Sequence, residues 1–124
     1  MMYRLRVESS FAAAHRLNIE KHKCESLHGH NWRVIVTVQG EKLDEHGMLV
    51  DFHELKKVVD RHVKRLDHVY INEVKPFDEV NPTTENICRY LSDAISTELN
   101  DGIAVHSVEI FESDKNMGMY LPEL

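Results

Sequence analysis

The fold class is decided by Asn31-Trp32-Arg33-Val34-Ile35-Val36-Thr37-Val38-Gln39, a stretch rich in β-branched residues. Its apolar side chains alternate and share one face of an extended chain: Trp32, Val34, Val36 and Val38. This pattern predicts a half-buried strand that starts near the histidines preceding it. Residues 3–11 alternate in the same way and predict a partner strand.

The middle of the chain predicts two helices. Asp51-Phe52-His53-Glu54 has the form of a capping box, and apolar residues then recur at three- and four-residue spacing, which predicts a helix over residues 52–66. Pro82-Thr83-Thr84-Glu85-Asn86 offers a hydroxyl cap and an acid for a second helix, which Asn100-Asp101-Gly102 ends. Residues 67–82 carry two prolines and predict a connection between the helices.

The last part of the chain predicts two more strands. Residues 103–112 return to a two-residue period, and residues 117–121 predict a short final strand after a turn. The predicted order is therefore β-β-α-α-β-β. Because the strands are grouped, this order predicts an α+β fold in which both helices cover one face of an antiparallel sheet. The exposed edges of such a sheet favour pairing with another subunit.

Length and composition restrict the function classes. The 124 residues predict a single domain, residues 1–124, that buries a core without disulfide staples. Two cysteines make no disulfide framework, and the N-terminus lacks the apolar run of a signal peptide, so we expect a cytoplasmic protein. The apolar runs are too short for a membrane helix, and the net charge of −6 argues against generic nucleic-acid binding. Neither a membrane nor a nucleic acid is an expected partner.

Three histidines predict a metal site. His28 and His30 are separated by one glycine, so their side chains share one face of an extended chain. His15 follows the first predicted strand, and a hairpin-like pairing of the two strands would bring it near them. Three protein ligands with a fourth position open to water or substrate are typical of catalytic zinc. The pattern favours Zn²⁺ bound by these three residues, and the alternative is a set of unrelated, partly buried histidines.

Cys24 lies four residues before His28 and has three interpretations. It is a small buried hydrophobe, a fourth zinc ligand that closes a structural site, or a thiolate whose pKa the nearby metal lowers. The charged neighbours Lys23 and Glu25 make burial unfavourable. The second interpretation predicts a non-catalytic zinc-binding domain, and the third predicts a base or nucleophile. Cys88 falls among core positions of the second predicted helix and is interpreted as packing.

Two further groups are candidates for proton transfer or ligand binding. Asp67-His68 follows the first predicted helix, where a carboxylate can orient an imidazole that relays a proton, although such a pair also serves as a cap or dipole partner. With Cys24 it becomes a candidate Cys-His-Asp relay. Glu112 ends the third predicted strand on its apolar side. It is either a solvated acid or a carboxylate that accepts two hydrogen bonds from a 2-aminopyrimidinone edge, as in pterin or guanine.

The combination of motifs resembles the 6-pyruvoyltetrahydropterin synthase family, and most closely its 6-carboxytetrahydropterin synthase branch. The resemblance covers nearly the whole chain. The motifs are Phe11-Ala12-Ala13-Ala14-His15, Cys24-x-x-x-His28-Gly29-His30-Asn31, Gly47-Met48-Leu49-Val50-Asp51-Phe52, Leu66-Asp67-His68, Asn81-Pro82-Thr83-Thr84-Glu85-Asn86 and Val108-x-x-x-Glu112-Ser113. Three residues separate Cys24 from His28, as in the carboxy branch, whereas the animal pyruvoyl type has five.

The resemblance implies a tunnelling fold, in which each subunit contributes a four-stranded sheet, three subunits close a barrel and two trimers stack into a hexamer. It also implies a zinc-dependent lyase of queuosine biosynthesis, which converts 7,8-dihydroneopterin triphosphate into 6-carboxytetrahydropterin with loss of triphosphate and acetaldehyde. Two related activities stay open as alternatives. One is a 6-pyruvoyltetrahydropterin synthase, and the other forms 6-hydroxymethyldihydropterin with a glutamate, for which Glu25 is the candidate.

The resemblance further implies roles for individual residues. The implied zinc ligands are His15, His28 and His30. The implied proton-transfer residues are Cys24, Asp67 and His68. The implied substrate-binding residues are Glu112, which anchors the pterin ring, and Thr83, Thr84 and Glu85. In this family the sites lie between subunits, so the relay is expected to be completed across an interface. The interpretation from a different class is a non-catalytic zinc-binding oligomeric domain, and the least favoured is a structural oligomer with incidental histidines.

Overall fold

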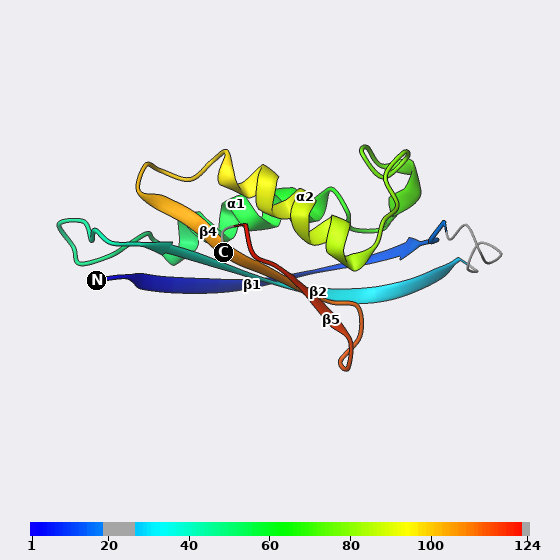
Figure 1. The fold of residues 1–124 in the computed structure, drawn as a ribbon, viewed down its shortest axis with the longest axis horizontal. Helices are drawn as coiled ribbons and strands as arrows, with labels where there is room; N and C mark the ends of the chain where they lie inside the picture. Colours follow the sequence, from blue (N-terminus) through cyan, green and yellow to red (C-terminus); the bar gives the residue numbers. More distant parts are fainter. Residues whose placement is uncertain (19–26, 123–124) are drawn as a thin grey trace.

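The fold is a five-stranded sheet in the order β3-β1-β2-β4-β5, with two helices on one face (Figure 1). The computed structural model describes residues 1–18 and 27–122, and of His28 only the backbone. The strands are β1 (Tyr3–His15), β2 (His28–Gly40), β3 (Val69–Tyr70), β4 (Ile103–Phe111) and β5 (Met117–Tyr120). The helices are α1 (Phe52–Lys64), the short 3-10 helix η1 (Ile71–Glu73) and α2 (Thr84–Ser96). The α+β class predicted from the sequence is confirmed.

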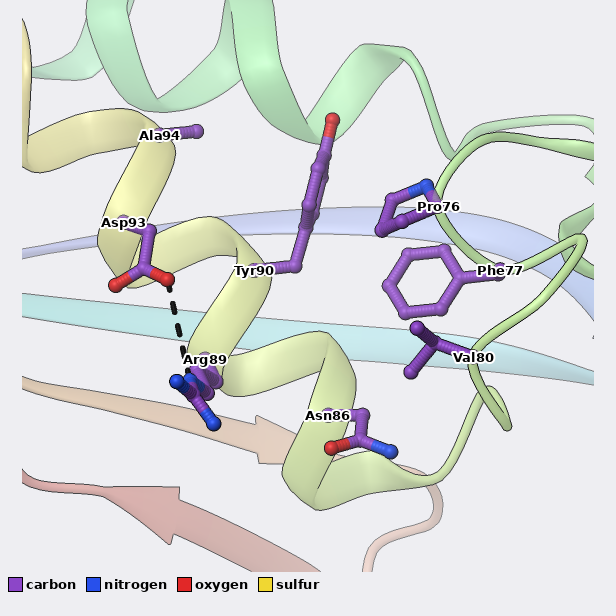
Figure 2. Close-up of a pocket in the computed structure, with 8 residues that line it drawn as sticks. All are labelled: Pro76, Phe77, Val80, Asn86, Arg89, Tyr90, Asp93 and Ala94. Carbon is purple, nitrogen blue, oxygen red and sulfur yellow. Dashed lines mark ion pairs between the residues drawn. The ribbon is translucent and has the colours of Figure 1, made fainter.

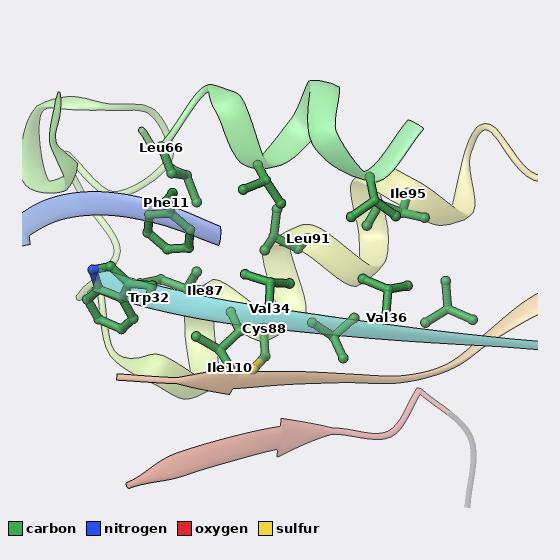
Figure 3. Packing of buried hydrophobic residues seen from close by; sticks show 14 of the residues in the cluster. Phe11, Trp32, Val34, Val36, Leu66, Ile87, Cys88, Leu91, Ile95 and Ile110 are labelled. Atoms are coloured by element: carbon green, nitrogen blue, oxygen red, sulfur yellow. The ribbon is translucent and has the colours of Figure 1, made fainter. Parts of the chain in front are cut away.

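The core lies between the sheet and the two helices, as Figure 3 shows. The face of β2 that the sequence predicts to be apolar is fully buried at Trp32, Val34, Val36 and Val38. The helices contribute these buried residues: Leu55, Val59 and Val63 from α1, and Ile87, Leu91 and Ile95 from α2. Packing of these two amphipathic faces on one side of the sheet leaves the other side uncovered by helices.

The two central strands are longer than the sequence predicts. β1 continues past Phe11 to His15, β2 begins at His28 rather than at Asn31, and the two strands pair antiparallel along their whole length. In this register Ala13 lies opposite His30, and His15 lies opposite His28. The histidines are therefore carried by paired strands, which hold their backbones more rigidly than loops would.

Both helices begin at the caps that the sequence predicts. The side chain of Asp51 accepts a hydrogen bond from the backbone N–H of His53, and that of Thr83 accepts one from Asn86. These contacts satisfy donors that the first helical turn leaves without an intrahelical partner. α1 ends at Lys64, two residues before the predicted end. Among the described residues, no helix is long and apolar enough to cross a membrane.

The sheet has one strand more than the four expected for a subunit, and this strand is not antiparallel. β3 lies within the segment predicted as a connection and pairs in parallel with β1, opposite Ala13 and Ala14. A strand of two residues is too short to show a two-residue period, so the sequence carried no signal for it. Because β3 covers only these two positions, most of β1 forms one edge of the described sheet, and β5 forms the other.

Candidate metal and substrate site

His15 is the most strongly positioned residue of the site. It ends β1 with only 1% of its surface exposed, and its Nδ1 lies 2.9 Å from the backbone oxygen of Pro82. A carbonyl oxygen only accepts, so Nδ1 carries the hydrogen and donates it. The lone pair of the neutral ring is then on Nε2, which is buried on the other side of the imidazole. A backbone contact of this kind typically fixes the tautomer of a metal-binding histidine.

His30 and Trp32 complete the wall beside His15. The ring centroids of the two histidines are 5.4 Å apart, and the indole of Trp32 lies edge-on to both, at 4.9 Å from His15 and 5.3 Å from His30. Trp32 is itself held by stacking on Phe11 and by an Nε1–H bond to the oxygen of Ala13. The sequence assigned Trp32 only to the core, whereas the structure also makes it the packing partner of both histidines.

Glu112 follows β4 and points into the same cluster. Its Oε1 lies 3.1 Å from Nε2 of His30, and its Oε2 accepts a hydrogen bond of 3.3 Å from the hydroxyl of Thr84. One ligand atom each from His15, His30 and Glu112 lies within 4.8 Å of the other two. Imidazole nitrogens and a carboxylate oxygen are ligands that zinc accepts, so these donors fit the expected metal. The structure thus brings together two predicted metal ligands and the predicted pterin acid.

Two predicted site residues are not placed. Cys24, together with Glu25, belongs to residues 19–26, which lie outside the described part of the chain. For His28 the structure describes the backbone, which pairs with that of His15 across the two central strands. The side chain of His28 lies outside the description, so its role as a ligand stays a prediction.

A pocket of about 270 Å³ adjoins the cluster. Its lining residues are Thr84, Glu85, Glu112, Asn116, Met117 and Gly118. Three of the four residues predicted to bind substrate therefore line one cavity. Thr83 is not among the lining residues. Its hydroxyl caps α2 by accepting a hydrogen bond from the backbone N–H of Asn86. Only the approach of β5 to α2 brings Gly118 and Asn116 to this cavity, and the sequence carried no sign of it.

The side chains of Asp67 and His68 are in contact at the edge of the sheet, where Asp67 Oδ2 lies 3.0 Å from His68 Nδ1. The other carboxylate oxygen accepts the backbone N–H of Ala12, and the N–H of His68 donates to the oxygen of Ala12. These contacts hold His68 at a φ of 56°, in the left-handed region that residues with a side chain rarely adopt. The His68 side chain is 81% exposed, so it projects outward from the surface of the protein.

The hydrogen bond from Ala12 is the main reason that the pKa of Asp67 lies below its ordinary value of 3.8, and His68 adds to the effect. Because folding lowers this pKa, ionised Asp67 stabilises the fold above pH 3.8, and the contribution disappears as the pH falls through the lowered value. We expect the Asp67→Asn variant to lose less stability between pH 5 and pH 2.5 than the wild type in urea unfolding. Asp93→Asn, at an exposed helix position, is the control and should follow the wild-type profile.

Cys88 is a core residue, as predicted. It is fully buried in α2, and its Sγ lies 3.7 Å from the backbone oxygen of Gly118. Burial raises the pKa of this thiol to about 12. A thiol that stays protonated at neutral pH has little nucleophilic character, so Cys88 does not compete with Cys24 for a catalytic role.

A larger cavity lies elsewhere in the described part of the chain. It has a volume of about 450 Å³ and lies between α2 and the segment before it (Figure 2). Its lining residues are Pro76, Phe77, Val80, Asn86, Arg89, Tyr90, Asp93 and Ala94. None of them is a predicted ligand or proton-transfer residue. The smaller pocket beside Glu112 is therefore the candidate substrate site, because it combines a cavity with the chemistry of the histidine cluster.

Comparisons with known proteins find relatives over nearly the whole chain. The family model described as 6-pyruvoyl tetrahydropterin synthase matches residues 4–123. A dihydroneopterin monophosphate aldolase of Pyrococcus furiosus is 38% identical over 115 residues, which cover 93% of this chain and 94% of that protein. A putative 6-carboxy-5,6,7,8-tetrahydropterin synthase of Archaeoglobus fulgidus is 36% identical over 108 residues, 87% of this chain and 86% of that protein.

A solved structure shares the fold over nearly the whole chain. The 6-pyruvoyl tetrahydropterin synthase of Caenorhabditis elegans superposes with a TM-score of 0.86 at 27% identity, covering 99% of this chain and 97% of that one. The sequence and structural matches thus extend over the same elements that carry the histidine cluster and the Glu112 pocket. The chain therefore belongs to the 6-pyruvoyl tetrahydropterin synthase family of pterin-metabolising enzymes.

Proposed function

We propose that this protein is a zinc-dependent lyase that converts 7,8-dihydroneopterin triphosphate into 6-carboxy-5,6,7,8-tetrahydropterin. The reaction consumes one water and releases triphosphate and acetaldehyde, and we assign it to queuosine biosynthesis in the cytoplasm. One observation carries the proposal: His15, His30 and Glu112 converge beside a pocket lined by Thr84 and Glu85, in a member of a pterin synthase family. The spacing of Cys24 and His28 favours the carboxy product over the pyruvoyl product.

The pterin ring would bind through Glu112. An ionised carboxylate is an acceptor with two oxygens, and the aminopyrimidinone edge of a pterin presents two N–H donors side by side. Two parallel hydrogen bonds of this kind fix the orientation of the ring as well as adding affinity. Thr84 and Glu85, which line the same pocket, would complete the polar contacts around the ring.

His15 and His30 would hold the zinc, with His28 as the third histidine. When bound, zinc supplies a Lewis acid that acidifies the side-chain hydroxyls of the substrate and the carbon-bound hydrogens next to them. Cys24, as a thiolate, would take one of these protons, and His68 would relay it while Asp67 holds the imidazole. Trp32, whose indole packs against both imidazoles, would shield the metal from water on that side.

The active form is proposed to be a hexamer of two trimers. The outward direction of His68 and the long edge of β1 support this part of the proposal. A residue that projects from its own subunit can serve a buried site only if that site belongs to a neighbour or is closed by one. Barrel closure by three subunits would also pair the exposed edges of the sheet.

A second candidate function is an aldolase acting on a dihydroneopterin phosphate. The identity of 38% to a dihydroneopterin monophosphate aldolase favours it. In this reaction a carbon–carbon bond of the side chain breaks, and the pterin retains a hydroxymethyl group. The candidate residue for this chemistry is Glu25, which directly follows Cys24.

The two functions are separated by the mass of the product. Zinc-loaded protein is incubated with 7,8-dihydroneopterin triphosphate and, separately, with the monophosphate, and the pterins are identified by mass spectrometry. We expect 6-carboxytetrahydropterin from the triphosphate, with one acetaldehyde per turnover. A hydroxymethyl product would instead establish the aldolase. A pyruvoyl product would establish a 6-pyruvoyltetrahydropterin synthase. If the metal-replete protein leaves both substrates untouched, both proposed functions are wrong. Protein treated with a chelator is the control.

A further inference from the structure

We infer that Glu112 is itself a metal ligand in the substrate-free protein, and that recognition of the pterin ring takes this carboxylate away from the metal. The inference rests on the proposed function for the metal and for the ring, but not on which product is formed. It assigns to one side chain two contacts that alternate during the reaction cycle. The contacts that carry it are those of Glu112 with His30 and with Thr84.

The first step concerns the distance between Glu112 and His30. Two ligand atoms that share one tetrahedral zinc at ordinary bond lengths lie roughly 3.4 Å apart. The observed separation of 3.1 Å between Glu112 Oε1 and His30 Nε2 is close to this value. A ligand atom of His15 lies within 4.8 Å of both, and because Nδ1 of that ring is held by Pro82, Nε2 is the nitrogen left for the metal. The carboxylate oxygen is therefore close enough to both histidines to share one metal ion with them.

The second step concerns the other oxygen of the carboxylate. Glu112 Oε2 accepts the hydroxyl of Thr84, the first residue of α2. Gly118 of β5 packs directly against Thr84, since a Cβ at Gly118 would lie 2.9 Å from the Thr84 methyl carbon. The hydroxyl is thus held by close packing between helix and strand. Glu112 lies at the boundary of the cluster, with one oxygen toward the histidines and the other toward the pocket.

The third step concerns the length of the ligand. The aminopyrimidinone edge of a pterin and the carbon that bears the side chain lie at opposite ends of the bicyclic ring. With the side chain of the substrate directed toward the histidines, a carboxylate that binds the far edge would be separated from them by the whole ring. Glu112 therefore turns from His30 into the pocket when the ring binds. A coordination position at the metal opens only when a pterin is recognised, which couples substrate selection to activation of the metal.

The test uses Co²⁺ in place of zinc, because its visible spectrum reports the number and kind of ligands. The probe is 6-methylpterin, which carries the aminopyrimidinone edge but lacks the side-chain hydroxyls. We expect Glu112→Gln to change the spectrum of the substrate-free protein and to weaken Co²⁺ binding at least about tenfold. Glu85→Gln, an acid of the same pocket, is the matched control and should leave the Co²⁺ spectrum unchanged.

Addition of 6-methylpterin should shift the wild-type spectrum toward that of the Glu112→Gln variant, with binding followed independently by pterin fluorescence. Identical spectra for wild type and Glu112→Gln would overturn the assignment of Glu112 as a ligand. A wild-type spectrum that stays unchanged while 6-methylpterin binds would show that Glu112 is not released from the metal. Absence of 6-methylpterin binding would overturn both this release and the assignment of Glu112 to the pterin ring. None of these readings involves turnover, so an unexpected product in the mass experiment leaves them intact.

Discussion

Replacement of Cys24 by alanine is expected to lower turnover of 7,8-dihydroneopterin triphosphate by about 100- to 10,000-fold, the usual contribution of a general acid or base, while bound zinc stays unchanged. The reason is the assignment of Cys24 as a proton-transfer group that is not a metal ligand. Turnover is measured at saturating substrate, and zinc is measured by elemental analysis of the same preparations.

The matched control removes the other thiol of the chain. Cys88 is fully buried and its pKa is raised to about 12, so Cys88→Ala should lower stability slightly and leave turnover near the wild-type rate. Loss of zinc together with activity in Cys24→Ala would show the opposite arrangement, in which Cys24 closes a structural site. That result would favour the non-catalytic zinc-binding interpretation.

The His15→Ala variant is expected to weaken zinc binding by at least about 100-fold and to abolish turnover. Even residues that only support a metal ligand contribute about 10- to 100-fold to affinity, and His15 is assigned as a ligand held in place by Pro82. Competition with a chromophoric chelator gives the zinc affinity. Circular dichroism establishes whether the variant is folded, and His15→Gln serves as a less disruptive second variant.

His46→Ala is the control for this experiment. His46 is exposed, and its Nε2 lies 3.6 Å from Oε1 of the neighbouring Glu45. Removal of this side chain should therefore change neither zinc affinity nor turnover. A folded His15 variant that binds zinc as tightly as the wild type would contradict the metal assignment. It would leave the buried imidazole as a structural hydrogen-bond donor to the loop before α2.

Local sequence patterns were sufficient for most of the fold. The alternation around Val34 and Val36 predicted the buried face of β2, and the caps Asp51 and Thr83 predicted where both helices begin. These signals are readable because each depends on residues close together in the chain, through side-chain periodicity or a side chain that bonds its own helix terminus. Strand ends were less predictable, because β1 continues through three alanines to His15 and β2 begins at His28, and these segments are extended by pairing with each other.

For the site, residue types and their spacing predicted the reactive groups, namely the histidines, Cys24, the Asp67–His68 pair and Glu112. Which of the described groups lie in contact depends on the tertiary fold. The approach of His15 to Pro82, of Trp32 to both histidines and of Glu112 to His30 depends on the register of paired strands and on helix packing. Such contacts join residues far apart in the chain, and one residue of register shift would turn each side chain to the opposite face of the sheet.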